Sequence, residues 1–111
     1  MVMLNEEEKK WLNSYRENLY DRFPDLVENI LLYGSKARGD SRRDSDLDLL
    51  ILIREGDRKL KKQVASIGIR PSIGTNVVPS IFVFTIKEWE RLKLRKSVFC
   101  DRIQEEGISF A

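Results

Sequence analysis

The stretch from residue 33 to residue 53, YGSKARGDSRRDSDLDLLILI, limits the possible folds of this chain more than any other. It closes with DLDLLILI, residues 46–53, whose last five residues are all apolar. A strand that is apolar on both faces lies in the middle of a sheet and is covered from both sides. Asp46 and Asp48 stand at its entrance, and two such residues project from the same side of a strand. Carboxylates beside a buried strand are costly without a positive charge, so this entrance is the first place to look for a function.

The flanking sequence predicts the elements that cover this strand. Asn5 and Glu8 form a capping box ahead of apolar residues at helical spacing, and Pro24 ends that helix. The remaining expected elements are a strand over residues 27–34, a helix through Leu60, Val64 and Ile67, a loop over residues 68–76, a strand over residues 77–85 placed at an edge or bulged by Pro79, a helix from Thr85 to about Leu94, and a helical turn with a short apolar end after Ser97. This order predicts an α/β (α+β) fold, a small mixed β-sheet with helices packed on it.

Length and composition exclude several classes of protein. A chain of 111 residues has room for one hydrophobic core, so residues 1–111 are expected to form a single domain. There is no histidine and only one cysteine, which excludes disulfide frameworks, His/Cys zinc sites and Ser-His or Cys-His nucleophiles. Any chemistry must therefore use carboxylates, lysines, hydroxyl groups or a hard cation.

Charge and hydropathy set further expectations about location and partners. The net charge is only +2 and the signs are interspersed, so nucleic acid is an unlikely partner. Nothing in the chain approaches the roughly 18 consecutive apolar residues of a membrane span, and the N-terminus is acidic and amphipathic, unlike a signal peptide. We expect a cytoplasmic protein that does not enter a membrane.

Two familiar motifs nearly match the charged connection and fail on chemistry. GSKARGDS has the glycine spacing of a phosphate-binding P-loop, but Asp40 takes the place of the lysine and would repel a phosphate. DSDLDLLILIRE places acidic residues at several positions of a calcium-binding loop, but Leu49 stands where that loop needs glycine for a sharp turn.

A third interpretation follows from the geometry of the connection. Asp46 and Asp48, about 7 Å apart along a strand, can share a hard cation or bridge two. Gly34 leaves room for a phosphate to approach, and Ser35 offers its hydroxyl and nearby backbone N–H groups to an anion. One loop and the next strand thus supply the two halves of a pocket for a metal ion and a nucleoside triphosphate.

The same residues resemble the signature of the minimal nucleotidyltransferases of the DNA polymerase β-like superfamily. That signature is Gly-Ser, ten residues, then Asp-x-Asp, and ten residues separate Gly34-Ser35 from Asp46-Leu47-Asp48. The resemblance implies a nucleotidyltransferase core like the polymerase β palm, with Mg²⁺ or Mn²⁺ on Asp46 and Asp48, which are also the catalytic residues. It implies a nucleoside triphosphate, with ATP expected, bound by Gly34 and Ser35, and assigns Lys36 and Arg38 to the same nucleotide site.

The resemblance leaves two functions open. Active members of the family take a third carboxylate from a later strand, and the matching stretch here, residues 76–85, contains no Asp or Glu, with Asn76 and Ser80 as the nearest polar residues. The first hypothesis is an enzyme that transfers a nucleoside monophosphate to an acceptor hydroxyl, for which a partner protein is the expected carrier. The second is an antitoxin-type binding module that neutralises a HEPN-domain partner by contact. Exposed edge strands also make a homodimer possible.

Overall fold

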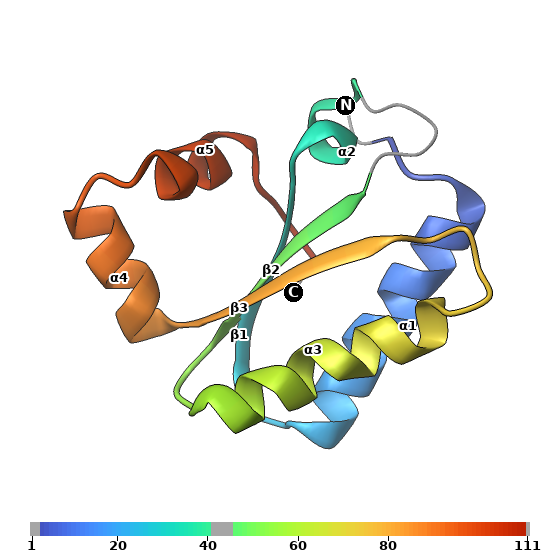
Figure 1. Cartoon of the computed structure of the whole chain (residues 1–111), viewed down its shortest axis with the longest axis horizontal. Helices are drawn as coiled ribbons and strands as arrows, with labels where there is room; N and C mark the ends of the chain where they lie inside the picture. Colours follow the sequence, from blue (N-terminus) through green and yellow to red (C-terminus); the bar gives the residue numbers. More distant parts are fainter. Residues whose placement is uncertain (1–2, 41–45, 111) are drawn as a thin grey trace.

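The computed structural model describes residues 3–40 and 46–110. Its elements follow the chain as α1 (Glu6–Arg22), β1 (Val27–Tyr33), α2 (Ser35–Arg38), β2 (Leu47–Ile53), α3 (Arg58–Ser72), β3 (Pro79–Thr85), α4 (Ile86–Leu94), α5 (Val98–Glu106) and β4 (Ile108–Ser109). Figure 1 shows them in this order along the colour gradient. The predicted α/β class and the predicted order of elements are confirmed.

The strands form one mixed sheet in the order β3-β2-β1-β4. β1 pairs with β2 and β4 in antiparallel fashion, whereas β3 runs parallel to β2. β2 therefore has a neighbour on each side, as its apolar sequence predicts. Pro79 begins β3 at the edge of the sheet, where its missing N–H costs no hydrogen bond within the ladder.

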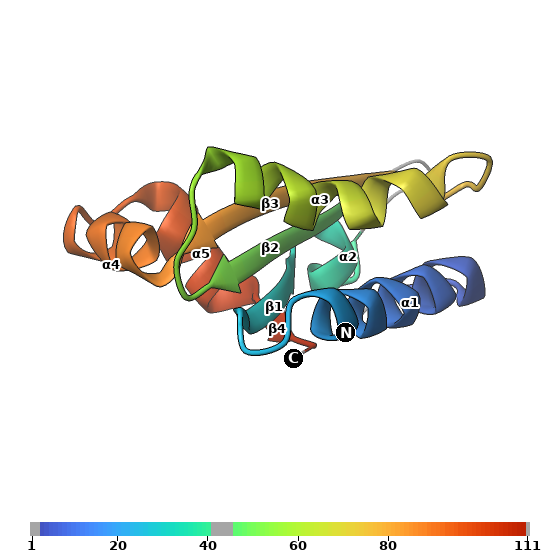
Figure 2. The same ribbon diagram turned by 90° about the horizontal axis from the view of Figure 1, so that it is seen from below.

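Helices cover the two faces of the sheet in pairs. α1 and α3 cover one face, and α4 and α5 cover the other, as Figures 1 and 2 show from two directions. The buried side chains between α1, α3 and the sheet form a first core, and those between α4, α5 and the other face form a second core. Trp11 and Tyr15 of α1 stack with ring centroids 5.2 Å apart in the first core, while Trp89 and Cys100 are buried in the second.

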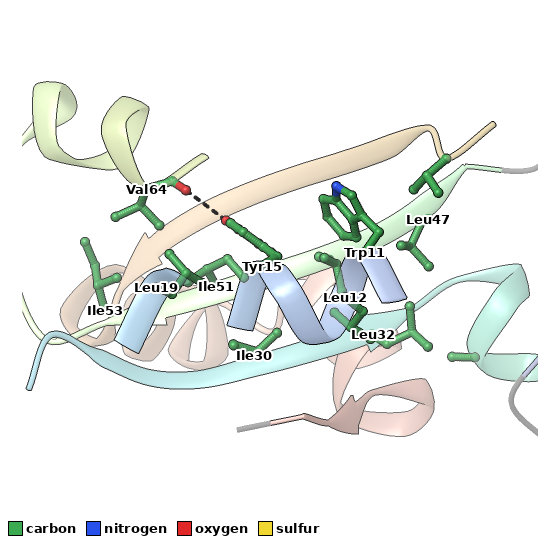
Figure 3. Close-up of a cluster of buried hydrophobic side chains, with 13 residues drawn as sticks. Trp11, Leu12, Tyr15, Leu19, Ile30, Leu32, Leu47, Ile51, Ile53 and Val64 are labelled. Carbon is green, nitrogen blue, oxygen red and sulfur yellow. Dashed lines mark hydrogen bonds between the residues drawn. The ribbon is translucent and has the colours of Figure 1, made fainter. Parts of the chain in front are cut away.

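Two hydrogen bonds between α1 and α3 fix how these helices cross. The Trp11 Nε1 donates to the carbonyl of Gly68 at 2.9 Å, and the Tyr15 hydroxyl donates to the carbonyl of Val64 at 2.9 Å (Figure 3). A Cβ at Gly68 would lie 2.9 Å from both Tyr15 Cε1 and Ile81 Cδ1, so this glycine allows the close approach.

The same packing corrects one prediction. Residues 68–76 were expected to form a loop, but α3 continues to Ser72 with Pro71 inside its last turn. Pro71 removes only the hydrogen bond to the carbonyl of Ile67. The tertiary contacts of Gly68 with α1 therefore outweigh the local helix-breaking signals of one glycine and one proline.

No helix within residues 3–40 and 46–110 has the length and apolar content needed to cross a membrane. The cytoplasmic location, the single domain and the homodimer stay predictions.

The α1–α3 contact yields a prediction about stability. Burial raises the pKa of Tyr15, so its hydroxyl stays protonated and keeps donating to the carbonyl of Val64. Replacing Tyr15 with phenylalanine should lower the free energy of unfolding by about 1 kcal/mol, the usual net contribution of such a bond. Tyr20→Phe, at a side chain 37% exposed, is the matched control and should change stability by less than about 0.5 kcal/mol. Equal urea unfolding midpoints for the two variants would contradict this account.

Candidate functional site

A short helical turn joins β1 to the charged connection. Gly34 has φ +78° and precedes the four-residue helix α2, which closes at Gly39 with φ +84°. Both glycines have a left-handed backbone, which residues with a Cβ rarely adopt. The backbone N–H groups of Gly39 and Asp40 both donate to the carbonyl of Ser35, at 2.9 and 3.1 Å, and complete the turn. Tyr33 and Gly34 thus lead directly from the sheet into a compact loop.

The turn lies against the entrance of β2 because of the strand register. Tyr33 is the partner of Asp48 in the β1–β2 ladder, so the next residue, Gly34, comes beside the Asp48 side chain. A Cβ at Gly34 would lie only 2.3 Å from Asp48 Oδ2. The predicted phosphate-binding glycine and the predicted metal-binding carboxylate are therefore in direct contact.

A cavity of about 390 Å³ opens at this contact. Four of the six predicted site residues line it: Gly34, Ser35, Arg38 and Asp48. The remaining wall includes Tyr33 from β1 and Phe99 and Arg102 from α5. A cavity of about 440 Å³ between α1 and α3 contains none of the predicted residues.

The carboxylates at the strand entrance repel each other. Asp46 is exposed and precedes the first residue of β2, while Asp48 is half-buried within the strand. Burial raises the pKa of Asp48, and the negative charge of Asp46 raises it further, whereas Arg38 acts in the opposite direction. Burial also raises the pKa of Tyr33 to about 12, with a further contribution from Asp48. The site thus has an excess of negative charge that a cation would relieve.

These donors fit a magnesium ion that is bound together with a nucleotide. Among the described residues, no group of three or more Asp, Glu, His or Cys side chains is placed to hold a metal ion. Mg²⁺ commonly binds through one or two carboxylates, with substrate phosphates and water supplying the other oxygens. Asp46 and Asp48 meet that requirement, provided that the nucleotide completes the coordination.

Lys36 lies elsewhere, although the sequence placed it in the nucleotide site. Its side chain is buried, and its Nζ lies 2.8 Å from Glu8 Oε2 of α1, which is also buried. The other carboxylate oxygen of Glu8 accepts the backbone N–H of Asn5 at 3.0 Å and completes the predicted capping box. Lys36 does not line the cavity; in this structure it ties α2 to the beginning of α1.

Glu106 is a site residue that the sequence analysis missed. Its carboxylate accepts the backbone N–H of Gly34 at 3.1 Å and the Arg38 Nη1 at 3.0 Å, and its side chain is 15% exposed. Arg38 also donates from Nε to Asp40 at 3.2 Å. Glu106 lies 72 residues from Gly34 in the chain, so no local pattern could connect them.

The strand expected to carry a third carboxylate has a serine in the matching place. Ser80 is the partner of Asp48 in the parallel β2–β3 ladder. Asn76 is exposed in the loop before β3, and Glu88 caps α4 beyond the other end of that strand, where it pairs with Lys61. None of the three places an additional charge beside Asp48.

Comparisons with known proteins address the family and the fold of the chain. The family model described as "Nucleotidyltransferase domain" matches residues 12–109. A curated protein of Methanocaldococcus jannaschii, named "Putative protein adenylyltransferase", is 26% identical over 98 residues, which are 87% of this chain and 92% of that protein. Among solved structures, a mutant of the toxin–antitoxin MntA–HpeT has a TM-score of 0.59 and 20% identity, with 98% of this chain and 73% of that chain covered. A toxin–antitoxin with AMP-PNP has a TM-score of 0.55 and 21% identity, with 87% and 69% covered. At these identities the two structures establish the fold.

The buried Lys36–Glu8 pair yields a second prediction about stability. Lys36→Met leaves the Glu8 carboxylate buried without its counter-charge, which should cost roughly 3 kcal/mol of unfolding free energy. Adding Glu8→Gln removes that charge but keeps an acceptor for the Asn5 N–H, so the double variant should recover most of the loss. Urea unfolding measures both. A double variant no more stable than Lys36→Met would show that the pair is not responsible.

The Gly34–Asp48 contact yields a third prediction, with a matched control. Gly34→Ala adds a Cβ at φ +78°, against Asp48 Oδ2, whereas Gly74→Ala adds one at φ +86° with nothing within 4 Å. Each substitution strains a backbone of positive φ by about 1–3 kcal/mol, and overpacking should cost Gly34→Ala about 1–3 kcal/mol more. Thermal unfolding of the two variants tests this, and equal destabilisation would mean that Asp48 moves aside freely.

Proposed function

We propose a nucleotide-transfer function from the premise that this chain belongs to the nucleotidyltransferase domain family, whose model covers residues 12–109. The protein binds a nucleoside triphosphate, ATP in the first instance, with Mg²⁺ or Mn²⁺, and transfers the nucleoside monophosphate to a hydroxyl group of a partner protein. The observation that carries the proposal is the contact between Gly34 and Asp48 at the edge of one cavity. It brings hydrogen-bond donors for an anion and carboxylate ligands for a cation close enough together to contact one bound nucleotide.

The donors around Gly34 orient the phosphates. Gly34, Ser35 and Arg38 line the cavity together, so the Gly34 N–H, the Ser35 hydroxyl and the Arg38 guanidinium are the donors nearest to it. Arg38 is exposed and carries a planar group that can bind two phosphate oxygens at once. Holding the triphosphate in a fixed position is a large part of catalysis in phosphoryl transfer, because little covalent chemistry is left to the protein.

Asp46 and Asp48 would hold the metal ion. When bound, the ion neutralises the charge that develops on the phosphate oxygens. The acceptor oxygen forms a bond to the α-phosphorus, the bond from that phosphorus to the oxygen bridging to the β-phosphate breaks, and pyrophosphate leaves. The proton of the acceptor hydroxyl passes to water, since Ser80, the partner of Asp48 in β3, is no base.

A second candidate function is favoured by that same serine. A member of the family with only two carboxylates is a weaker catalyst, and neutralisation of a HEPN-domain partner by contact needs no catalysis. Apolar side chains beside the site support a contact role: Phe82 of β3 is 48% exposed and Val98 at the start of α5 is 75% exposed. The solved toxin–antitoxin structures of similar fold agree with a protein partner in either case.

Titration with nucleotide tests the enzymatic proposal. Wild-type protein should bind ATP in the presence of Mg²⁺ and much more weakly without it, as measured by calorimetry. Asp46→Asn with Asp48→Asn should lower the affinity for Mg²⁺–ATP on the order of 100-fold, because two charged oxygen ligands are lost. Glu17→Gln with Asp21→Asn removes the same charge from the exposed side of α1 and should leave binding unchanged.

The same variants distinguish the enzymatic function from the contact function. An enzyme loses transfer to the partner in the Asp46→Asn/Asp48→Asn variant while it keeps its affinity for the partner. A binding module neutralises its partner equally well with or without the two carboxylates. Absence of Mg²⁺-dependent nucleotide binding in the wild type would refute the enzymatic proposal and leave the contact role.

A further inference from the structure

Glu106 occupies the same donors that the proposed function assigns to the nucleotide phosphates. Its two carboxylate oxygens lie 3.0 Å from the Arg38 Nη1, and one of them lies 3.1 Å from the backbone nitrogen of Gly34. A carboxylate and a phosphate both bring negatively charged oxygens to N–H donors. Both cannot bind the same N–H groups at once, so the side chain and a phosphate oxygen are alternatives there.

The position of Glu106 in its helix is unfavourable apart from these contacts. It is the last residue of α5, and the last turn of that helix contains no basic residue. The C-terminal end of a helix carries a partial negative charge, which repels a carboxylate. Asp48 lies close enough for Glu106 to raise its pKa, so a second negative charge is also nearby. The donors of Gly34 and Arg38 are what offsets this repulsion.

The Glu106 side chain can leave without any movement of its backbone. Cys100 and Ile103 anchor α5 in the second core, both at most 1% exposed. After the helix, the Gly107 N–H donates to the carbonyl of Ile103 at 2.7 Å, and β4 then pairs with β1. The backbone on both sides of Glu106 is thus fixed, while its side chain is 15% exposed and contacts Gly34 and Arg38, which line the cavity. Rotation about side-chain bonds is enough to release the donors.

We propose that Glu106 is a positioning residue that acts as an internal substitute for a nucleotide phosphate. In the nucleotide-free protein it holds Arg38 and the Gly34 N–H group in place, and an arriving phosphate displaces it. The inference rests on the proposed function, because it takes the nucleotide to be the displacing anion. It assigns to Glu106 an effect opposite in sign to that of a binding residue: the side chain stabilises the fold and weakens the affinity for nucleotide.

Glu106→Gln and Glu106→Ala test this inference against Glu105→Gln. Glu105 is the exposed neighbour in the same helix turn, and its substitution removes the same charge. The probes are ATP and inorganic tripolyphosphate, each with Mg²⁺ and each titrated by calorimetry. Both Glu106 variants should bind the two probes roughly tenfold more tightly than the wild type, which corresponds to about 1.4 kcal/mol. Their unfolding temperatures should be lower than that of Glu105→Gln.

Tighter binding combined with lower stability supports the inference. Removal of a merely structural residue would instead lower both the affinity for the probes and the stability of the fold. Equal affinities in Glu106→Gln and Glu105→Gln overturn the inference. So does weaker binding of Mg²⁺–ATP by Glu106→Gln, which would make Glu106 a ligand of the metal or the nucleotide. If tripolyphosphate follows the expected order while ATP binds to no variant, Glu106 competes with a phosphate but not with a nucleotide, so the nucleotide form of the inference and the nucleotide-transfer function both fail. Binding of neither probe to any variant overturns both.

Discussion

The absence of a side chain at Gly34 is the constraint on which the site depends. The register of β1 and β2 pairs Tyr33 with Asp48, so the residue after Tyr33 must pass the Asp48 carboxylate. A Cβ here would lie 2.3 Å from Asp48 Oδ2, so glycine lets the chain pass without displacing that carboxylate. The backbone of Gly34, with φ +78°, then turns the chain into α2 and directs its N–H group to the Glu106 carboxylate. One glycine thus sets both the shape of the turn and its distance from the strand.

Charge compensation explains why the turn is held so firmly on both sides. On the side of α1, the buried Lys36–Glu8 pair connects α2 to the helix that covers the first core. On the side of α5, Glu106 binds Arg38 and the Gly34 N–H group. Alternate residues of one four-residue helix therefore face opposite partners: Lys36 turns inward to a permanent one, and Arg38 turns outward to one that a ligand can replace. A buried pair of this kind is hard to break, whereas an exposed one is exchanged readily.

The sequence predicted the local features of the fold, but it did not predict those that depend on contacts between residues far apart in the chain. The capping box at Asn5, the helix that begins after Thr85, the central position of β2 and the edge position of Pro79 follow from patterns within a few residues, and all are confirmed. The continuation of α3 through residues 68–72 depends on α1, which meets it only in the folded chain.

The candidate site divides in the same way. The spacing from Gly34 to Asp48 follows from one motif, and the structure brings these residues together in one cavity. The direction of the Lys36 side chain and the presence of Glu106 depend on α1 and α5, which no spacing rule links to the motif.

The electrostatics of the cavity bear on the order in which its ligands enter. A free triphosphate is repelled by Asp46, Asp48 and Glu106, and a free magnesium ion finds two carboxylates and takes its other oxygens from water. In the complex of the two, the ion reduces the repulsion and the phosphates replace part of that water. Glu106 increases the preference of the site for this complex, since a phosphate must first replace Glu106 at Arg38 and at Gly34. A site built from two carboxylates and one replaceable anion therefore favours the metal–nucleotide complex over either component alone.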